Sequence, residues 1–170
     1  MKKLQTTVLS IVSISCLLFS GGCGTKEKNS TSSHDSHEAM HSAQQEDIAE
    51  TTKNAKVLPS FLSTSNSKTR KAYETVGQHQ ELLQWIPCYC GCGQSVGHKS
   101  NLNCFIRSTK PSGEIVWDSH ATTCANCIEI AVESASLQQQ GKSTLEIRKY
   151  IDNKYKEGYA KPTPTPMPRS

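Results

Sequence analysis

The sequence has no long apolar segment, few aromatic residues and little net charge. Aromatic residues make up 6% of its 170 residues, and the formal charge is +4. So small a basic excess, without a basic stripe or a platform of stacking aromatics, gives no reason to expect a nucleic acid as partner. No Ser-His-Asp order, phosphate-binding loop or carboxylate pair indicates a hydrolase, and we predict no catalytic residue.

The N-terminus has the layout of an export signal. Its apolar run, Val8–Phe19, is too short to span a bilayer, which takes about 20 residues. The run follows two lysines and ends in Ser-Gly-Gly-Cys at residues 20–23. This ending resembles the lipobox of bacterial lipoproteins, although the family prefers Leu where Ser20 stands. The resemblance implies that residues 1–22 are a lipoprotein signal peptide and that Cys23 is lipidated. Acyl chains such as palmitate would then hold the protein on the extracytoplasmic face of the cell membrane.

Residues 23–56 contain almost no large apolar side chain, so we expect a disordered tether there. Within it, residues 34–41 (HDSHEAMH) hold three imidazoles and a thioether. Such a run could capture copper or zinc loosely. A polar linker that happens to contain histidine is the simpler interpretation, because an unfolded segment does not pre-organise a site.

The next segment, residues 57–159, is predicted to be a Cys-rich globular domain. We expect a mainly α fold: a small single domain of about three helices with a Cys-rich loop and a short β-hairpin. The helices are predicted from apolar periodicity and capping signals, and the hairpin from two β-favouring runs around Lys-Pro-Ser-Gly. The helix ranges are 67–85, 122–140 and 143–157, and the hairpin strands are 104–107 and 114–117. Residues 160–170 form a Pro-rich tail, predicted to be an extended spacer, with a docking peptide as the alternative.

Six cysteines fall in the predicted domain, and three of them are crowded into five residues. They are Cys88, Cys90, Cys92, Cys104, Cys124 and Cys127. In an extended segment the first three thiols would point to one face. Cys124 and Cys127 would share one side of a helix, and His120 would extend the same stripe. His98, between Cys92 and Cys104 in sequence, is a further candidate ligand.

Three uses of these sulfurs remain open. The thiolates, assisted by His98 or His120, could bind one or two soft or borderline metal ions, Cu(I) or Zn(II). The cysteines could instead pair as three structural disulfides, for which fifteen connectivities exist. The third use is thiol redox chemistry by the Cys124-x-x-Cys127 pair at a helix N-terminus. We favour metal binding, because disulfide frameworks usually spread their cysteines to close larger loops. The redox use is weakened by the lack of a βαβ pattern around the pair.

The heptapeptide Pro-Cys-Tyr-Cys-Gly-Cys-Gly at residues 87–93 is highly specific. Together with Gly97-His98-Lys99-Ser100, Cys104, His120 and Cys124–Cys127, it resembles the bacterial PCYCGC-motif lipoprotein family, from about residue 58 to 168. The resemblance implies an exported, lipid-anchored protein of Gram-positive type whose activity is not assigned. It marks the cysteines as the signature and supplies no substrate.

The sequence therefore predicts a membrane-anchored extracytoplasmic protein that holds copper or zinc through its six cysteines. The partner is the membrane, through the lipid anchor, and no protein partner is indicated. The competing prediction is a disulfide-stapled interaction module or a redox protein. An enzymatic role is the less favoured one.

Overall fold

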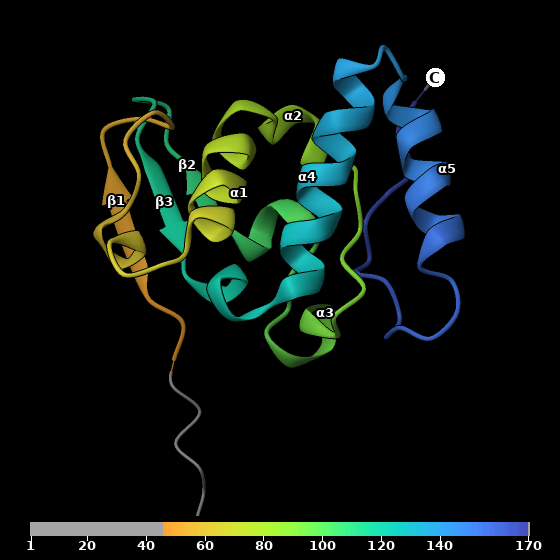
Figure 1. Ribbon diagram of the computed structural model, residues 1–170, viewed down its shortest axis with the longest axis horizontal. Helices are drawn as coiled ribbons and strands as arrows, with labels where there is room; N and C mark the ends of the chain where they lie inside the picture. Colours follow the sequence, from red (N-terminus) through yellow and green to blue (C-terminus); the bar gives the residue numbers. More distant parts are fainter. Residues whose placement is uncertain (1–45, 170) are drawn as a thin grey trace, which may run out of the picture. The chain divides into compact units, whose positions relative to one another are not determined.

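The computed structural model describes residues 46–169 (Figure 1). In that part of the chain, five α-helices accompany one three-stranded antiparallel sheet. Helices predominate, which agrees broadly with the mainly α prediction, and the sheet makes this a small mixed α/β domain. The expected signal peptide, Cys23 and the His-rich segment at 34–41 lie outside the described residues.

The sheet contains the predicted hairpin and one strand that was not predicted. Strands β2 (Ile106–Thr109) and β3 (Ile115–Asp118) form the hairpin, and β1 (Ala49–Thr52) pairs with the other edge of β3. The predicted tether ran to residue 56, so its last part belongs to the fold. The sequence Ala-Glu-Thr-Thr of β1 has no apolar pattern to reveal it. Its Thr52 is buried and accepts a hydrogen bond of 2.8 Å from the indole of Trp117.

The first predicted helix is divided in two. Helix α1 (Ser67–Gln78) begins with Asn66, whose side chain accepts from the backbone N–H of Thr69, and α2 (Gln80–Leu83) follows after a break at His79. Gly77, near the end of α1, was unexplained by the sequence. A Cβ at this position would lie 2.7 Å from the carbonyl oxygen of Ala55, so glycine permits the close approach of the loop after β1.

The two C-terminal helices agree closely with prediction. Helix α4 (Ala125–Gln139) follows a short 3₁₀ turn, so it begins three residues later than expected, and it ends before Gly141, whose φ is 84°. Helix α5 (Thr144–Lys154) begins with the predicted capping box. The hydroxyl of Ser143 accepts from the N–H of Glu146, whose carboxylate accepts from the N–H of Ser143. This reciprocal pairing satisfies two N–H groups that the helix start would leave unpaired.

Aromatic side chains join the sheet to α1. Tyr73 of α1 packs edge-on against Phe105 and tilted against Trp117, with ring centroids 4.9 and 5.9 Å apart. Its hydroxyl donates a 2.6 Å hydrogen bond to the carbonyl of Asp118 at the end of β3. Each aromatic pair contributes about 0.5–1.5 kcal/mol beyond its area of burial. These contacts fix α1 against the sheet, next to the loop that carries Cys104.

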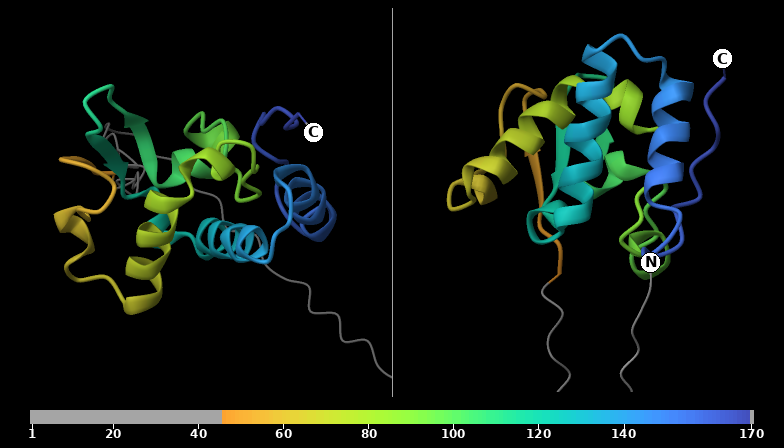
Figure 2. Two further views of the ribbon diagram at one scale, coloured as in Figure 1. Left: turned by 90° about the horizontal axis from the view of Figure 1, so that it is seen from above. Right: turned by 45° about the vertical axis from the view of Figure 1, so that its right-hand side comes forward.

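The Pro-rich tail packs back onto the domain instead of extending away from it. It runs beside α5 (Figure 2), where Arg148 donates to the carbonyls of Thr165 and Pro166 at 3.2 and 2.9 Å. Thr163 and Thr165 are buried although both are polar. The proline spacing leaves these alternate threonine side chains facing the protein. The tail thus acts as a structural strap for the domain.

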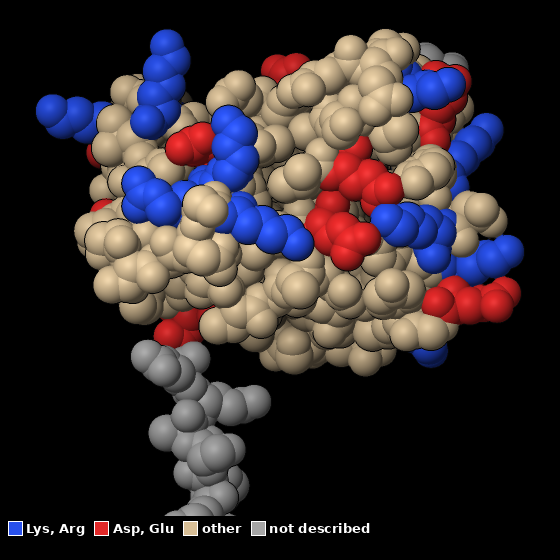
Figure 3. All heavy atoms as spheres, viewed as in Figure 1, with Lys and Arg blue, Asp and Glu red and all other residues tan. Residues whose placement is uncertain are grey.

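On the face shown in Figure 3, acidic side chains lie near the middle with basic ones on both sides. One basic group, Lys154 of α5, bonds Glu129 and Glu133 of α4 at 3.1 and 2.7 Å. Among the residues described, no helix is both long and apolar enough to cross a membrane.

Candidate functional site

The motif's three cysteines lie on a loop that turns sharply. Cys88 and Cys90 are on the approach, Gly91 adopts a φ of 93°, and Cys92 begins the short helix α3 (Cys92–Ser95). The expected extended segment with alternating thiols is therefore wrong at its end. A left-handed turn favours glycine, which has no Cβ to clash. The turn brings the third thiol back, and the three sulfurs lie within 4.8 Å of one another.

The other three cysteines come from two more elements. Cys104 ends the 3₁₀ helix Asn101–Cys104, Cys124 is the N-cap of α4, and Cys127 lies in the first turn of α4. The buried Asn101 ties these elements together. Its amide donates to the carbonyl of Cys127 at 3.1 Å, and its backbone N–H donates to the carbonyl of Ile86 at 2.7 Å. The six predicted cysteines are therefore collected into one place, which we call the sulfur cluster.

Within the sulfur cluster, three of the sulfurs contact two neighbouring sulfurs each. The Sγ atoms of Cys88, Cys90 and Cys127 form a triangle with sides of 3.4, 3.5 and 3.6 Å. The sulfurs of Cys92 and Cys104 lie 3.6 Å apart. All six cysteines are free, and only Cys90 and Cys124 are partly exposed.

These separations match a metal-thiolate site better than a disulfide. A disulfide holds its sulfurs about 2.05 Å apart. Four thiolates placed tetrahedrally about 2.3 Å from a zinc ion lie about 3.8 Å from one another. The observed 3.4–3.6 Å is close to the second value. The sulfur cluster therefore has the spacing of a ligand set around a metal ion.

Both predicted histidines lie beside the sulfurs. His98 groups with Cys92 and Cys104, with their ligand atoms within 4.8 Å of one another. His120 belongs to none of these groups, but Cys90 lies near enough to raise the pKa of its imidazole, and the ring pairs with Asp47, at 2.7 Å between Nδ1 and Oδ2. The two imidazole rings meet edge to face with centroids 4.7 Å apart. The His120 side chain thus lies beside the cluster rather than continuing the Cys124–Cys127 stripe.

The thiols differ in acidity because they hydrogen-bond to one another. The pKa of Cys88 falls to about 4, mainly through the neighbouring thiols of Cys104 and Cys127. The pKa of Cys90 lies far below its usual range because of the neighbouring thiols of Cys104 and Cys124. The pKa of Cys104 is raised by the neighbouring Cys127 and Cys88 and by burial. Since the thiolate is the form that binds metal, the direction of these shifts favours Cys88 and Cys90 as ligands.

The pKa values of Cys124 and His98 are also shifted by burial and by neighbouring groups. A hydrogen bond from Cys127 lowers the pKa of Cys124, but its hydrogen bond to Cys90 and its burial outweigh this and raise the pKa overall. That is opposite to the acidification expected of a redox thiol at a helix N-terminus. Burial and the neighbouring His120 lower the pKa of His98, which favours the neutral imidazole that a metal needs.

Three residues at the site were missed by the sequence analysis. Asp47, which pairs with His120, lies in the predicted tether. Thr163 of the tail accepts from the backbone N–H of Cys88 at 2.9 Å, and Asn101 bridges the loops. The alternation of threonine and proline in the tail was the one available signal for Thr163. No local signal marked Asp47 or Asn101, because their partners are distant in sequence.

No curated protein and no solved structure shows significant similarity to the chain. A family described as "Protein of unknown function with PCYCGC motif" matches residues 11–168, which include all six clustered cysteines, both histidines and most of the tail. This confirms the resemblance carried by the heptapeptide. The chain therefore belongs to the PCYCGC-motif family, whose function is unknown.

Proposed function

We propose that this protein is an extracytoplasmic lipoprotein that binds copper or zinc in its sulfur cluster and sequesters or hands over the metal. The observation that carries the proposal is the triangle of sulfurs formed by Cys88, Cys90 and Cys127, with sides of 3.4–3.6 Å. Three sulfurs in mutual contact suit a shared cation. A buried group of thiolates without one would repel itself in a medium of low dielectric constant.

The sulfur cluster has enough ligands for two ions. One ligand set is Cys90, Cys124 and Cys127, and the other is Cys92, Cys104 and His98. Cys88 groups with members of both sets, so its sulfur is placed to serve as the fourth ligand of each. Two four-coordinate ions sharing one thiolate would use all six cysteines and one histidine, and tetrahedral sulfur and nitrogen coordination is the normal geometry of structural zinc.

The donor atoms limit the kind of metal. Thiolate and imidazole ligands select Cu(I) and Zn(II), whereas Mg²⁺ and Ca²⁺ require oxygen. The two sets described above contain no carboxylate. Copper and zinc are therefore the two candidates, and elemental analysis distinguishes them.

The structural disulfide alternative requires every cysteine to have a single partner. In the sulfur cluster, Cys88 and Cys90 each contact two other sulfurs, and Cys88 and Cys90 are only two residues apart. Closing so small a ring strains disulfide geometry. The contacts therefore favour the metal over three separate disulfides.

The proposal is tested by counting thiols and metal in the same sample. The protein is purified anaerobically without added metal, its thiols are titrated under denaturation, and copper and zinc are measured by elemental analysis. We expect six titratable thiols in the folded domain and a stoichiometric amount of one metal. Six oxidised sulfurs with no metal would overturn the proposal in favour of the disulfide-stapled module.

The lipid anchor is tested separately. Lipidation at Cys23 requires the thiol, so Cys23→Ser is expected to move the protein from the membrane fraction to the medium. Mass spectrometry of the wild-type N-terminus should show acyl chains on this residue. A wild-type protein that is secreted without acyl groups would contradict the anchor and leave the metal site unaffected.

A further inference from the structure

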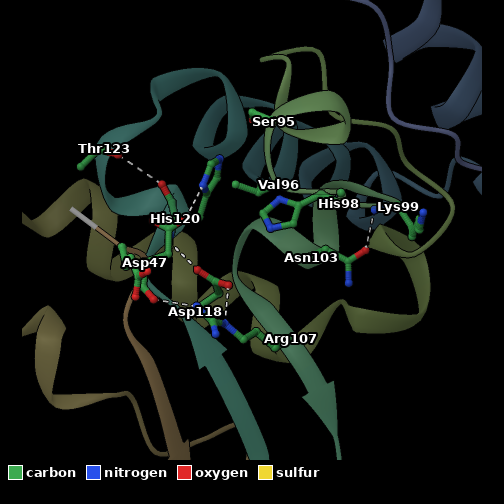
Figure 4. A pocket seen from close by; sticks show the side chains of 12 residues that line it. Asp47, Ser95, Val96, His98, Lys99, Asn103, Arg107, Asp118, His120 and Thr123 are labelled. Atoms are coloured by element: carbon green, nitrogen blue, oxygen red, sulfur yellow. Dashed lines mark hydrogen bonds and ion pairs between the residues drawn. The ribbon is translucent and has the colours of Figure 1, made fainter. Parts of the chain in front are cut away.

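A pocket of about 860 Å³ is lined by His98 and His120, the two histidines beside the sulfur cluster, and Figure 4 shows its lining side chains. It is formed between the start of the described chain, the loop after α3 and the end of β3. Carboxylates and bases both line it, among them Glu46, Asp47, Lys99, Arg107, His98 and His120. None of the six clustered cysteines lines it. The sulfur cluster therefore lies next to a pocket that its cysteines do not line.

His98 and His120 connect the pocket with the sulfurs. Both line the pocket, and their rings touch with centroids 4.7 Å apart. His98 also groups with Cys92 and Cys104, and Cys90 lies near enough to His120 to raise the pKa of its imidazole. An ion that moved from the pocket to the sulfur cluster would therefore meet these two imidazoles first.

The imidazole of His120 is held in a fixed orientation. The ring nitrogen Nδ1 pairs with the carboxylate of Asp47 at 2.7 Å. The backbone N–H of His120 donates to the carboxylate of Asp118 at 2.8 Å. Arg107 supports both acids, since it pairs with the Asp118 carboxylate at 2.7 Å and donates to the Asp47 carbonyl at 2.7 Å. A carboxylate on one ring nitrogen is the usual support of a metal-binding histidine, and Nε2 is then the nitrogen that binds the metal once its proton has left.

His98 contributes a nitrogen that lacks a protein partner. Its Nδ1 is buried and has no hydrogen bond within the described part of the chain. Buried polar atoms are nearly always paired, so an unpaired nitrogen among sulfurs and a second imidazole points to a ligand. Neutral imidazole is among the commonest metal ligands in proteins.

We propose that this pocket is the route by which metal enters and leaves the sulfur cluster, and that His98 and His120 form a transfer site on that route. The inference rests on the proposed function and adds the path and its first ligands. An incoming ion exchanges water for imidazole nitrogen. Each metal–nitrogen bond that is not retained then breaks as a metal–sulfur bond forms, and any thiol or imidazolium that binds releases its proton to solvent. The metal keeps its oxidation state throughout.

Stopped-flow kinetics with Cu(I) tests the transfer site. Cu(I), supplied anaerobically as its acetonitrile complex, is mixed with the metal-free protein, and uptake is followed by thiolate–copper absorption. Release is followed by the colour of excess bathocuproine disulfonate. A transfer site speeds both directions alike, so His120→Ala should slow uptake and release by the same factor, about tenfold for a barrier raised by about 1.4 kcal/mol, while the final stoichiometry stays unchanged. His79→Ala, which removes an imidazole outside the pocket, is the matched control and should load like wild type.

A second variant tests the route without touching a histidine. Val96 lines the pocket and is 51% exposed, so Val96→Trp should narrow the opening while leaving the core intact. We expect full stoichiometry with slower uptake. Wild-type rates in both His120→Ala and Val96→Trp would overturn the transfer site and leave metal binding in place. A wild-type protein that takes up neither Cu(I) nor Zn(II) would overturn the proposed function itself, and this inference with it.

Discussion

Thr163 and Cys88 form a two-way backbone and side-chain pair. The N–H of Cys88 donates to the hydroxyl of Thr163 at 2.9 Å, and the N–H of Thr163 donates to the carbonyl of Cys88 at 2.9 Å. Both residues are buried. The tail strap therefore fixes the backbone of the cysteine that lies between the two ligand sets.

We predict that Thr163→Val destabilises the protein. Valine preserves the shape but removes the acceptor, and the buried N–H of Cys88 is left without a partner. The expected loss in the free energy of unfolding is about 1–3 kcal/mol. Urea denaturation of the metal-free protein measures it. Thr109→Val, on the exposed edge of β2, is the control and should change stability by less than about 0.5 kcal/mol. Equal stabilities of the two variants would show that the strap does not hold the loop.

We predict that Cys88 and Cys124 differ in their importance for metal binding. Cys88 groups with members of both ligand sets, whereas Cys124 belongs to one. Cys88→Ser should therefore weaken binding of both ions, and Cys124→Ser should weaken one and leave the other tightly bound. Titration against a chromophoric competitor chelator resolves the two ions. Identical losses in both variants would contradict a shared thiolate at Cys88.

We predict a pH-dependent contribution from His120. Its pKa is raised to about 9 from 6.5, first by the hydrogen bond with Cys90 and then by Asp47. The fold therefore favours the protonated ring, and this stabilisation is complete below about pH 6.5 and is lost as the pH rises through 9. The groups that face the ring are Asp47, Cys90 and His98.

The test is the difference in Tm between the metal-free wild type and Asp47→Asn across this range. Asparagine lacks the charge that favours the imidazolium, so the difference should be largest near pH 6 and shrink toward pH 9. A difference that is constant from pH 6 to pH 9 would show that Asp47 does not stabilise the protonated ring.

We predict that Gly77→Ala destabilises the protein even though alanine is the better helix former. The added Cβ would lie 2.7 Å from the carbonyl oxygen of Ala55. Overpacking of this kind costs about 1–3 kcal/mol, and the gain in helix propensity is about 1 kcal/mol. The Tm of Gly77→Ala is compared with that of Gln139→Ala, a control on the exposed end of α4 whose stability should be unchanged or slightly higher than that of the wild type. A Gly77→Ala protein that is more stable than wild type would show that the loop can move away.

Several helix ends and the hairpin could be predicted because each depends on residues that are neighbours in the sequence. The capping box at Ser143 and Glu146, the hairpin turn and the stop at Gly141 each depend on neighbouring residues. The break at His79 and strand β1 were not predicted, because their partners are distant in the sequence. The side chain of His79 bonds Gln138, 59 residues away in sequence, and β1 pairs with β3, more than 60 residues away.

By itself, the sequence determined which sulfurs belong together and which family the chain joins, because the heptapeptide and the Cys-x-x-Cys pair are contiguous motifs. Only the tertiary structure decided how the sulfurs are shared. The contact of Cys88 with Cys127 spans 39 positions, and that of Asp47 with His120 spans 73. Such contacts depend on how the sheet, α4 and the tail pack around the motif loop. Packing brings distant thiols and imidazoles together in one buried place, and no spacing along the chain specifies it.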